Sequence, residues 1–317
     1  MSFLQKINID FTGKTKYALI VSILIILSGI SSLIYKGGPS LSIDFTGGRK
    51  IQITVAEKYD NGEYKPETLT NKIDINKIRN GIPGSEIKAI SGEHTIEIIL
   101  PPLESTNYEN EDTYGTAVDK ILDEIPNSTI EMDEFIGPTI GAELRDDALM
   151  AIGIALLLIT LYISFRFDLF FAYGSLAALV HDIIITLGIF SLLDKQIGLE
   201  IVAAFLTILG YSLNDTIVVF DRLRETKEKF SADPIDDIIN KALNSTLSRT
   251  MITSLTTLMA VTTLYIFGEG DLKGFAFALI IGVFVGTYSS IFVASPVMKF
   301  FELRRKDNPE EDLEEGV

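Results

Sequence analysis

The stretch of sequence that decides the fold runs from Ile201 to Phe220 and reads IVAAFLTILGYSLNDTIVVF. It is long enough to cross the hydrocarbon core of a bilayer, which takes about 20 residues of α-helix. Its apolar character is interrupted by Asn214 and Asp215. Because an ionisable side chain is costly inside a membrane, such a residue marks a functional site by default. The stretch therefore predicts a transmembrane helix that carries a functional carboxylate.

Five further apolar runs accompany this one, so we predict a polytopic α-helical membrane protein with six transmembrane helices. The runs are Tyr17–Tyr35, Leu149–Phe165, Leu169–Leu193, Met251–Phe267 and Phe275–Phe300. The mean hydropathy of +0.31 agrees, because a soluble domain needs a mostly polar surface. The first run follows lysines, as a signal peptide does, but it is longer than a signal core and no small-residue cleavage site follows it. We therefore expect an uncleaved first helix.

The lysines and arginines outside these runs predict the orientation of the chain. Most of them lie on the side of the N-terminus, whereas the short loops on the opposite side hold only Lys195 and Lys273. We therefore expect a multi-pass protein of the plasma (inner) membrane with both termini in the cytoplasm. The expected parts are a cytoplasmic segment 1–16, helix one at 17–35, an exterior domain at 36–147, helices two to six at 148–300 with a cytoplasmic loop at 221–249, and an acidic cytoplasmic tail at 301–317.

The charge and the residue usage exclude several kinds of function. The formal net charge is −16, with the acidic residues gathered in the exterior domain and the tail, which argues against nucleic-acid binding. There is no cysteine, and the two histidines, His94 and His181, lie far apart, so we expect no disulfide, no metal site and no cofactor.

The exterior segment predicts a small α+β domain of the ferredoxin-like, split βαβ kind. Alternation of apolar and polar residues indicates strands, and apolar residues at helical spacing indicate helices. In chain order the expected elements are strand Lys50–Ala56, helix Ile73–Asn80, strands Glu86–Ile90 and His94–Leu100, helix Thr116–Ile125 and strand Thr129–Ile136.

Asp215 has two interpretations. Burial disfavours the charged form of a carboxylate, which suits reversible proton uptake; alternatively, Asp215 is held in a permanent structural ion pair. Arg249 lies where the fifth run enters the membrane and is followed by Thr253, Thr256 and Ala260 at helical spacing. Arg249 either pairs with Asp215 and releases it during a cycle, or is an ordinary inner anchor.

Two other features of the apolar runs leave a similar choice open. His181 and Asp182 lie in the middle of the third run, as a proton relay or as a hydrogen-bonded structural pair. The sixth run carries a ridge of small residues that allows close helix packing, or else a surface that slides during conformational change. The ridge consists of Gly282, Gly286, Ser290 and Ala294.

Six segments match the signature sequences of a known family in the family's order. They are Ser42–Gly48 (SIDFTGG), Ile136–Leu144 (IGPTIGAEL), His181–Gly188, Gly210–Arg222, Asn244–Thr250 and Gly286–Ser290. On these segments the chain resembles the SecF family of protein-export membrane proteins, which belongs with SecD to the resistance-nodulation-division superfamily. The single set of six helices is similar to a separate SecF and not to a fused SecDF.

The resemblance implies an accessory subunit of the Sec preprotein translocase that, with SecD, uses the proton-motive force to promote protein export. It implies a transport subunit and not an enzyme, acting beside the SecYEG channel and the SecA motor, with YajC and YidC as further partners, on a translocating preprotein. By motif position Asp215 would carry the proton and Arg249 would be its basic partner. A moving joint to the exterior domain would consist of Asp44, Thr46, Gly47 and Gly48, with a second tether at Gly137, Pro138 and Gly141.

Two rival functions remain as alternatives. One is half of an exporter of small molecules or lipids, although the exterior domain is small for that role. The other is a passive scaffold of the translocation channel, in which Asp215 would be dispensable. A soluble-type enzyme is disfavoured, because the glycine pairs Gly37–Gly38 and Gly47–Gly48 lack the rest of a phosphate-binding pattern.

Overall fold

The structure is a computed structural model that describes residues 8–54, 85–91, 95–102, 115, 119 and 129–307. The chain divides into two compact units, and each is described by itself. The first contains residues 1–40 and 150–317 and holds the membrane-spanning helices; the second contains residues 41–149 and holds a β-sheet.

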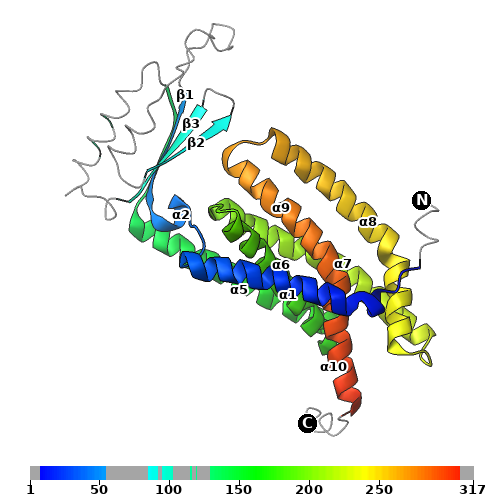
Figure 1. Cartoon of the computed structure of the whole chain (residues 1–317). Coiled ribbons are helices and arrows are strands. Elements are labelled where there is room, and N and C mark those ends of the chain that lie inside the picture. The colour runs from blue at the N-terminus through cyan, green and yellow to red at the C-terminus, as the bar shows by residue number, and fades with distance from the viewer. Residues whose placement is uncertain are drawn as a thin grey trace. The chain divides into compact units, whose positions relative to one another are not determined.

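The described residues contain six helices long and apolar enough to cross a membrane, as the apolar runs predicted. They are α1 (Phe11–Lys36), α5 (Pro138–Arg166), α6 (Leu169–Leu192), α7 (Leu199–Lys229), α8 (Ile235–Phe267) and a sixth that joins α9 (Gly270–Ser289), the π-helical turn η4 (Ser290–Ala294) and α10 (Ser295–Asp307) (Figure 1). The fold class is thus confirmed for the helical part.

Several helices extend well beyond the apolar runs that predicted them. Helix α7 continues to Lys229 and α8 begins at Ile235, so most of the segment 221–249 that we expected to be a loop is helical. Apolar run length reports only the part of a helix that meets lipid, whereas these helix ends are polar. Ion pairs from Lys227 to Glu302 and from Lys299 to Asp236 tie the polar ends to α10.

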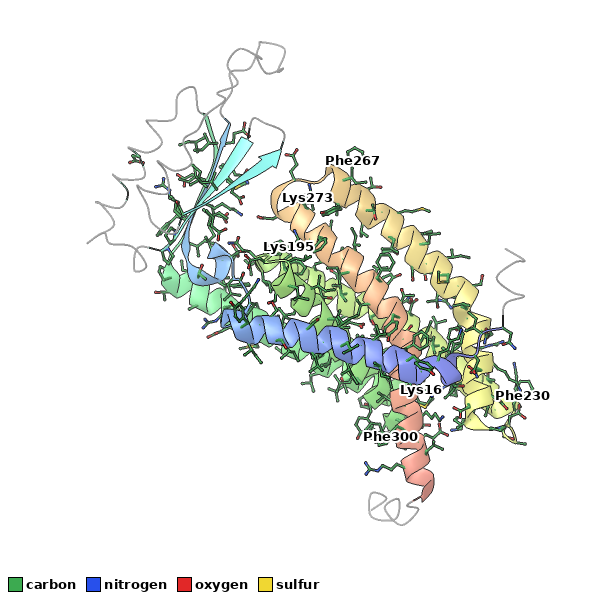
Figure 2. The ribbon with its side chains drawn as sticks, in the orientation of Figure 1. Lys16, Lys195, Phe230, Phe267, Lys273 and Phe300 are labelled. Atoms are coloured by element: carbon green, nitrogen blue, oxygen red, sulfur yellow. The ribbon has the colours of Figure 1, made fainter. Side chains whose placement is uncertain are left out.

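The helices differ in how much of their surface this chain covers. About half of the apolar window of α6, α7 and α9–α10 is buried, against 11% for α1, 11% for α5 and 17% for α8. Large apolar side chains such as Phe165, Leu158 and Met259 are therefore exposed on the outer helices. Figure 2 shows Lys195 and Lys273 near one end of the helix bundle and Lys16 near the other.

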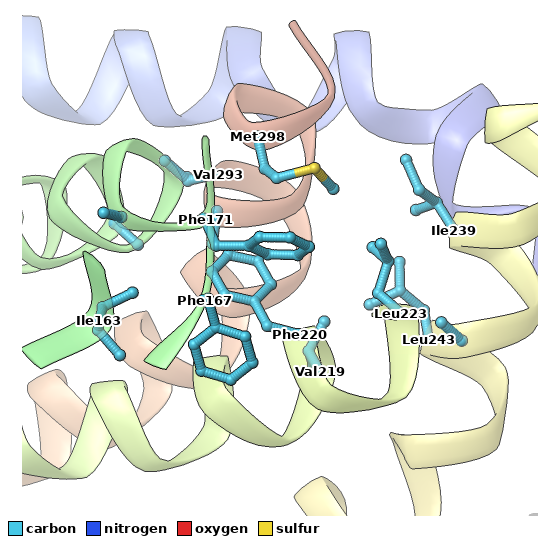
Figure 3. Packing of buried hydrophobic residues seen from close by; sticks show 14 of the residues in the cluster. Ile163, Phe167, Phe171, Val219, Phe220, Leu223, Ile239, Leu243, Val293 and Met298 are labelled. Carbon is cyan, nitrogen blue, oxygen red and sulfur yellow. The ribbon is translucent and has the colours of Figure 1, made fainter. Parts of the chain in front are cut away.

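An aromatic cluster fixes α6, α7 and α10 against one another. The rings of Phe171 and Phe220 lie 4.9 Å apart in an edge-on arrangement, and Phe167 approaches Phe171 at 5.6 Å. Figure 3 shows these rings with Met298 of α10 beside them. Because lipid is as apolar as these side chains, close van der Waals packing holds such an interface together.

Helix α1 meets α6 at a pair of glycines. A Cβ atom at Gly29 would lie 2.6 Å from the Cα atom of Gly188, closer than two such atoms can come. Because the obstacle is backbone, it cannot move aside as a flexible side chain could. This glycine pair therefore allows the two helices to lie in direct backbone contact.

We expect Gly29→Leu to force α1 away from α6 and to lower the melting temperature of the detergent-solubilised protein. The loss expected is about 1–3 kcal/mol, the scale of overpacking a close interface. Gly153→Leu is the matched control, since Gly153 lies exposed on α5 with open space around it. Equal melting temperatures for the two variants would show that the glycine contact is not needed.

The second unit contains a four-stranded sheet of β1 (Gly48–Thr54), β2 (Glu86–Ser91), β3 (Thr95–Leu100) and β4 (Thr129–Ile136) in the order β2-β3-β1-β4. Each described neighbour pair is antiparallel, so β1 and β2 run parallel with β3 between them. This order is that of a split βαβ unit, and all four strands lie close to their predicted positions. The predicted helix Ile73–Asn80 lies outside the described residues, as does Thr116–Ile125 except Asp119, which is helical.

Alternation along the strands buries one face of the sheet. Ile51 and Ile53 of β1 pair across the ladder with Ile98 and Ile96 of β3. Ile51, Ile53, Ile98 and Leu100 are no more than 1% exposed. The regular side-chain period of a strand thus explains why this part of the domain could be predicted.

An exposed ion pair joins β1 to β4. Arg49 donates two hydrogen bonds to the carboxylate of Asp133, at 2.8 and 2.6 Å, and the pair lowers the pKa of Asp133 below its ordinary 3.8. A lowered folded-state pKa stabilises the domain above the unfolded pKa, and that contribution is lost as pH falls through the folded value.

We therefore expect Asp133→Asn to destabilise the domain at neutral pH by up to about 1 kcal/mol, because the pair is partly solvated. The difference between the wild type and the variant should close below about pH 4. Chemical unfolding at several pH values measures it, with exposed Asp147→Asn as the control. A difference that persists at low pH would mean that the side chain acts through its shape and not its charge.

Candidate functional site

Asp215 lies on α7 and is only 3% exposed. One carboxylate oxygen, Oδ2, is buried without a hydrogen-bond partner among the described residues. A buried polar atom without a partner is uncommon and costs free energy, so a functional cause is expected for it. The preceding residue, Asn214, is exposed on the same helix and so faces outward from this chain.

Arg249 of α8 is the predicted basic partner of Asp215, and the structure brings the two residues into the same neighbourhood. The charge of Arg249 and the hydroxyl group of Thr253 both act on the Asp215 carboxylate. In the described part of the chain, however, Asp215 and Arg249 do not form an ion pair within 4.0 Å. Arg249 is exposed at the surface of the bundle. A carboxylate near a cation that it does not bind directly can change its pairing when a proton arrives.

The predicted polar stripe on α8 faces outward. Arg249, Thr256 and Ala260 are exposed, and Thr253 is partly exposed. Together with Asn214 they form a polar edge of this chain, which we call the α7–α8 edge. A guanidinium and an amide on such an edge are costly to present to lipid tails, so another polar surface is expected there.

His181 and Asp182 lie inside the bundle on α6, where they form part of a buried hydrogen-bond network. The Nδ1 atom of His181 lies 3.0 Å from Oδ1 of Asp182, which is completely buried. The other oxygen of Asp182 accepts hydrogen bonds from Ser212 of α7, at 2.6 Å, and Ser289 of α9, at 2.9 Å. The network therefore connects three helices at one carboxylate.

The same network reaches α1 through residues that the sequence analysis missed. The Nε2 atom of His181 lies 3.1 Å from Oγ of Ser22, and Ser22 lies 2.9 Å from the hydroxyl group of Tyr288. Tyr288 donates to the backbone carbonyl of Ala18 at 2.6 Å. No signal in a single sequence pairs a serine of the first helix with a histidine of the third, because the pairing depends on helix packing.

Gly282 and Gly286, the members of the small-residue ridge on α9, lie against α7, whereas Ala294 of η4 lies against Gly174 of α6. A Cβ atom at Gly282 would meet Ile208 at 2.2 Å, and one at Gly286 would meet Ser212 at 3.0 Å. Gly286 therefore leaves room for the hydroxyl group of Ser212 beside Asp182. Ser290 begins the π-helical turn η4, an irregularity often found where a helix serves a function.

The two predicted joint motifs lie against each other within the second unit. Gly47 and Gly48 have positive φ values of 75° and 136°, which favour glycine. A Cβ atom at Gly47 would lie 2.9 Å from the Cα atom of Pro138, and one at Gly141 would lie 2.9 Å from the nitrogen of Gly47. The motifs thus form one close backbone contact where β1 begins and β4 ends.

The other joint residues hold this contact in shape. Thr46 donates a hydrogen bond to the carbonyl of Ser42 at 3.0 Å, and the nitrogen of Asp44 donates to the Ser42 hydroxyl at 3.2 Å. Gly137 has open space around the position of a Cβ atom, and its carbonyl accepts from the nitrogen of Gly141 at 3.0 Å. Whether the contact moves as a joint stays a prediction.

No group of three or more His, Asp or Glu side chains within the described ranges is placed to hold a metal ion.

Comparisons with known proteins point to one family. Residues 117–304 match the family described as "Protein export membrane protein SecD/SecF, C-terminal". The protein translocase subunit SecF of Calditerrivibrio nitroreducens is 42% identical over 94% of this chain and 96% of that protein. The SecF subunit of Escherichia coli O157:H7 is 37% identical over 96% of this chain and 91% of that protein.

A solved structure has the same fold. The crystal structure of SecDF, a translocon-associated membrane protein of Thermus thermophilus, matches with a TM-score of 0.78 and 35% identity. The match covers 95% of this chain and 39% of the SecDF chain, so this chain spans about two fifths of that protein.

Proposed function

Because the chain belongs to the SecD/SecF family of protein-export membrane proteins, we propose that it acts as the SecF subunit that couples proton movement to preprotein export. The observation that carries the coupling is Asp215, a carboxylate buried in an apolar span. Within the described part of the chain one of its oxygens has no hydrogen-bond partner, and it lies near Arg249 without binding it. A passive scaffold has no use for a buried group of this cost.

In the proposed cycle Asp215 is ionised and attracted to Arg249 until a proton arrives. Protonation removes the negative charge of Asp215 and with it the electrostatic attraction that holds Arg249 nearby. Helices α7 and α8, which carry the two residues, can then shift relative to each other. The chain connects the membrane part to the exterior domain through Ser42–Gly48 and Gly137–Gly141, so these motifs would transmit the shift.

SecD is the partner we propose for the α7–α8 edge. In the SecDF protein of Thermus thermophilus the part similar to this chain is fused to the remainder of a longer polypeptide. The exposed side chains of Asn214 and Arg249 call for polar groups opposite them, which a second set of helices can supply. The wider partners SecYEG, SecA, YajC and YidC stay predictions.

With a bifunctional reagent that joins a thiol to an amine, a cysteine placed at Asn214 should therefore cross-link to SecD. The chain contains no cysteine, so Asn214→Cys is the only thiol that this subunit contributes. We expect a cross-linked SecD adduct in membranes for this variant and none for Leu158→Cys, an exposed site on α5. Adducts of equal yield from both sites would contradict a partner specific to the α7–α8 edge.

We propose that both termini lie in the cytoplasm of a cell whose plasma membrane the helices cross. The support is the small number of bases in the outer loops, Lys195 and Lys273, which lie at one end of the bundle (Figure 2).

The function is tested by export of a secretory precursor in cells depleted of their own SecF. The chain is supplied with its cognate SecD, and the rate of precursor maturation is measured with and without a proton gradient. We expect rescue that depends on the gradient. Rescue that is independent of the gradient would favour a scaffold, and loss of solute resistance with normal secretion would favour a small-molecule exporter.

A further inference from the structure

A directed chain of hydrogen bonds links the centre of the bundle to helix α1. It runs from Asp182 to His181, from His181 to Ser22, from Ser22 to Tyr288 and from Tyr288 to the carbonyl of Ala18. Its four contacts measure 3.0, 3.1, 2.9 and 2.6 Å in that order. Because each member has a known number of protons, the direction of every hydrogen bond can be assigned.

The assignment starts at the α1 end. A carbonyl oxygen only accepts, so Tyr288 donates its single proton to Ala18. Ser22 must then donate its own single proton to Tyr288, and it is left as an acceptor toward His181. The Nε2 atom of His181 therefore carries a proton.

The Asp182 end then requires a second proton. A neutral imidazole with its proton on Nε2 has a bare Nδ1, which would face a carboxylate oxygen of Asp182 at 3.0 Å, lone pair against lone pair. The contact becomes a hydrogen bond only if a proton sits on Nδ1 of His181 or on Oδ1 of Asp182. Either way, the pair holds two protons.

A proton on the other oxygen of Asp182, Oδ2, would not replace the one needed between Nδ1 of His181 and Oδ1. The Oδ2 atom of Asp182 accepts from Ser212 and lies 2.9 Å from Ser289, whose single proton can also go to the carbonyl of Gly286 at 3.2 Å. Even with a proton on Oδ2, Nδ1 of His181 and Oδ1 of Asp182 would face each other lone pair against lone pair. The second proton therefore lies between His181 and Asp182.

Few charged groups compete for this proton among the described residues. Helix α1 faces the pair with Ser22, α7 with Ser212, and α9 with Ser289 and the titratable Tyr288. In the described part of the chain, His181 is the only charged or titratable side chain that acts on the Asp182 carboxylate. The turn η4 and helix α10 meet α6 at Gly174 through apolar residues, Ala294 and Met298.

We propose that the His181–Asp182 pair is a proton-binding site separate from Asp215, and that its second proton completes the three hydrogen bonds that hold α1 at Ser22 and Ala18. When that proton leaves, the remaining one bonds Nδ1 of His181 to Asp182, and Nε2 becomes an acceptor. Ser22 then turns its proton toward His181. Tyr288 can then donate its single proton to Ser22 or to the carbonyl of Ala18, so one of these two hydrogen bonds is lost. This site includes neither Asp215 nor Arg249, so it is additional to the proton site of the proposed function.

The protons can be observed directly, because the chain has only two histidines. In the His94→Gln variant, nitrogen-15 labelled histidine reports His181 alone. We expect NMR of the full chain in lipid bilayers to show a protonated Nε2 at low pH, and the loss of one proton as pH rises. A bare Nε2 with a proton fixed on Nδ1 at every pH would overturn the proposal.

The attachment of α1 is tested by a distance measurement in the same bilayers. Nitroxide labels on Lys14→Cys of α1 and Lys229→Cys of α7 report the distance between the two helices without background thiols. We expect the distance distribution to shift at the pH where His181 loses its proton. An unchanged distribution would overturn the link to α1.

Two serine variants identify the path. Ser22→Ala interrupts the hydrogen-bond chain and should abolish the pH-dependent shift, while the His181 titration persists and shows that the protein is folded. Ser28→Ala is the control and should behave like the wild type, since among the described residues Ser28 bonds only to the carbonyl of Ile25 within α1, at 2.8 Å. A shift that survives in Ser22→Ala would rule out this path.

Discussion

Asp215→Asn is expected to abolish the gradient-dependent part of preprotein export while leaving assembly with SecD intact. Asparagine has nearly the shape of aspartate but cannot bind and release a proton. Removal of a proton-transfer group lowers the rate of the step that it serves by about 10²- to 10⁴-fold. Precursor maturation should therefore fall to the rate of cells that lack the chain. The measurement is a pulse–chase of a secretory precursor with the proton gradient present or collapsed.

Two further variants make this result specific. Asp215→Glu retains a carboxylate and should restore part of the gradient-dependent rate. Glu228→Gln removes an exposed acid from the polar end of α7 and should export like the wild type. Full activity of Asp215→Asn in assembled complexes would make Asp215 a structural residue.

Gly48→Ala is expected to destabilise the β-sheet unit strongly, although it adds only one methyl group. The φ angle of 136° at Gly48 is one that residues with a side chain rarely adopt, at a cost of about 1–3 kcal/mol. The added Cβ atom would also lie 2.5 Å from the carbonyl oxygen of Leu100 in β3. Because β1 is paired on both sides, it cannot move away from β3 without straining its pairing to β4.

Gly137→Ala provides the matched control within the same pair of motifs. A Cβ atom at Gly137 would meet nothing within 4 Å, and its φ angle is not positive. We expect limited proteolysis of the full-length protein in membranes to cut the Gly48→Ala variant faster, with Gly137→Ala close to the wild type. Equal cleavage of both variants would mean that the backbone at Gly48 can relax.

The elements that could be predicted are those with a regular pattern. Membrane thickness fixes the length of an apolar run, so all six helices could be located without knowledge of their packing. Strand β4 was predicted at Thr129–Ile136 because side chains of a strand alternate between two faces. Polar helix ends such as Arg222–Lys229 carry neither signal, which is why they were expected to be loop.

The candidate site could be predicted only at residues whose side chains are costly to place inside a membrane. Asp215 and His181–Asp182 are conspicuous as polar residues in apolar spans, and Arg249 by its position at a membrane entry. Ser22 and Ser212 are not conspicuous, because a hydroxyl group can bond to its own helix and is tolerated in any transmembrane span. Their role emerges only from the packing of α1 and α7 against α6.

The α7–α8 edge has a consequence for a copy of this protein that lies alone in the bilayer. A newly made copy without a partner exposes Asn214 and Arg249 to surroundings that solvate them poorly. Water drawn toward these groups would thin the bilayer locally and mark the copy as unassembled. A copy on its own is therefore expected to be less stable in the bilayer than one whose α7–α8 edge is covered.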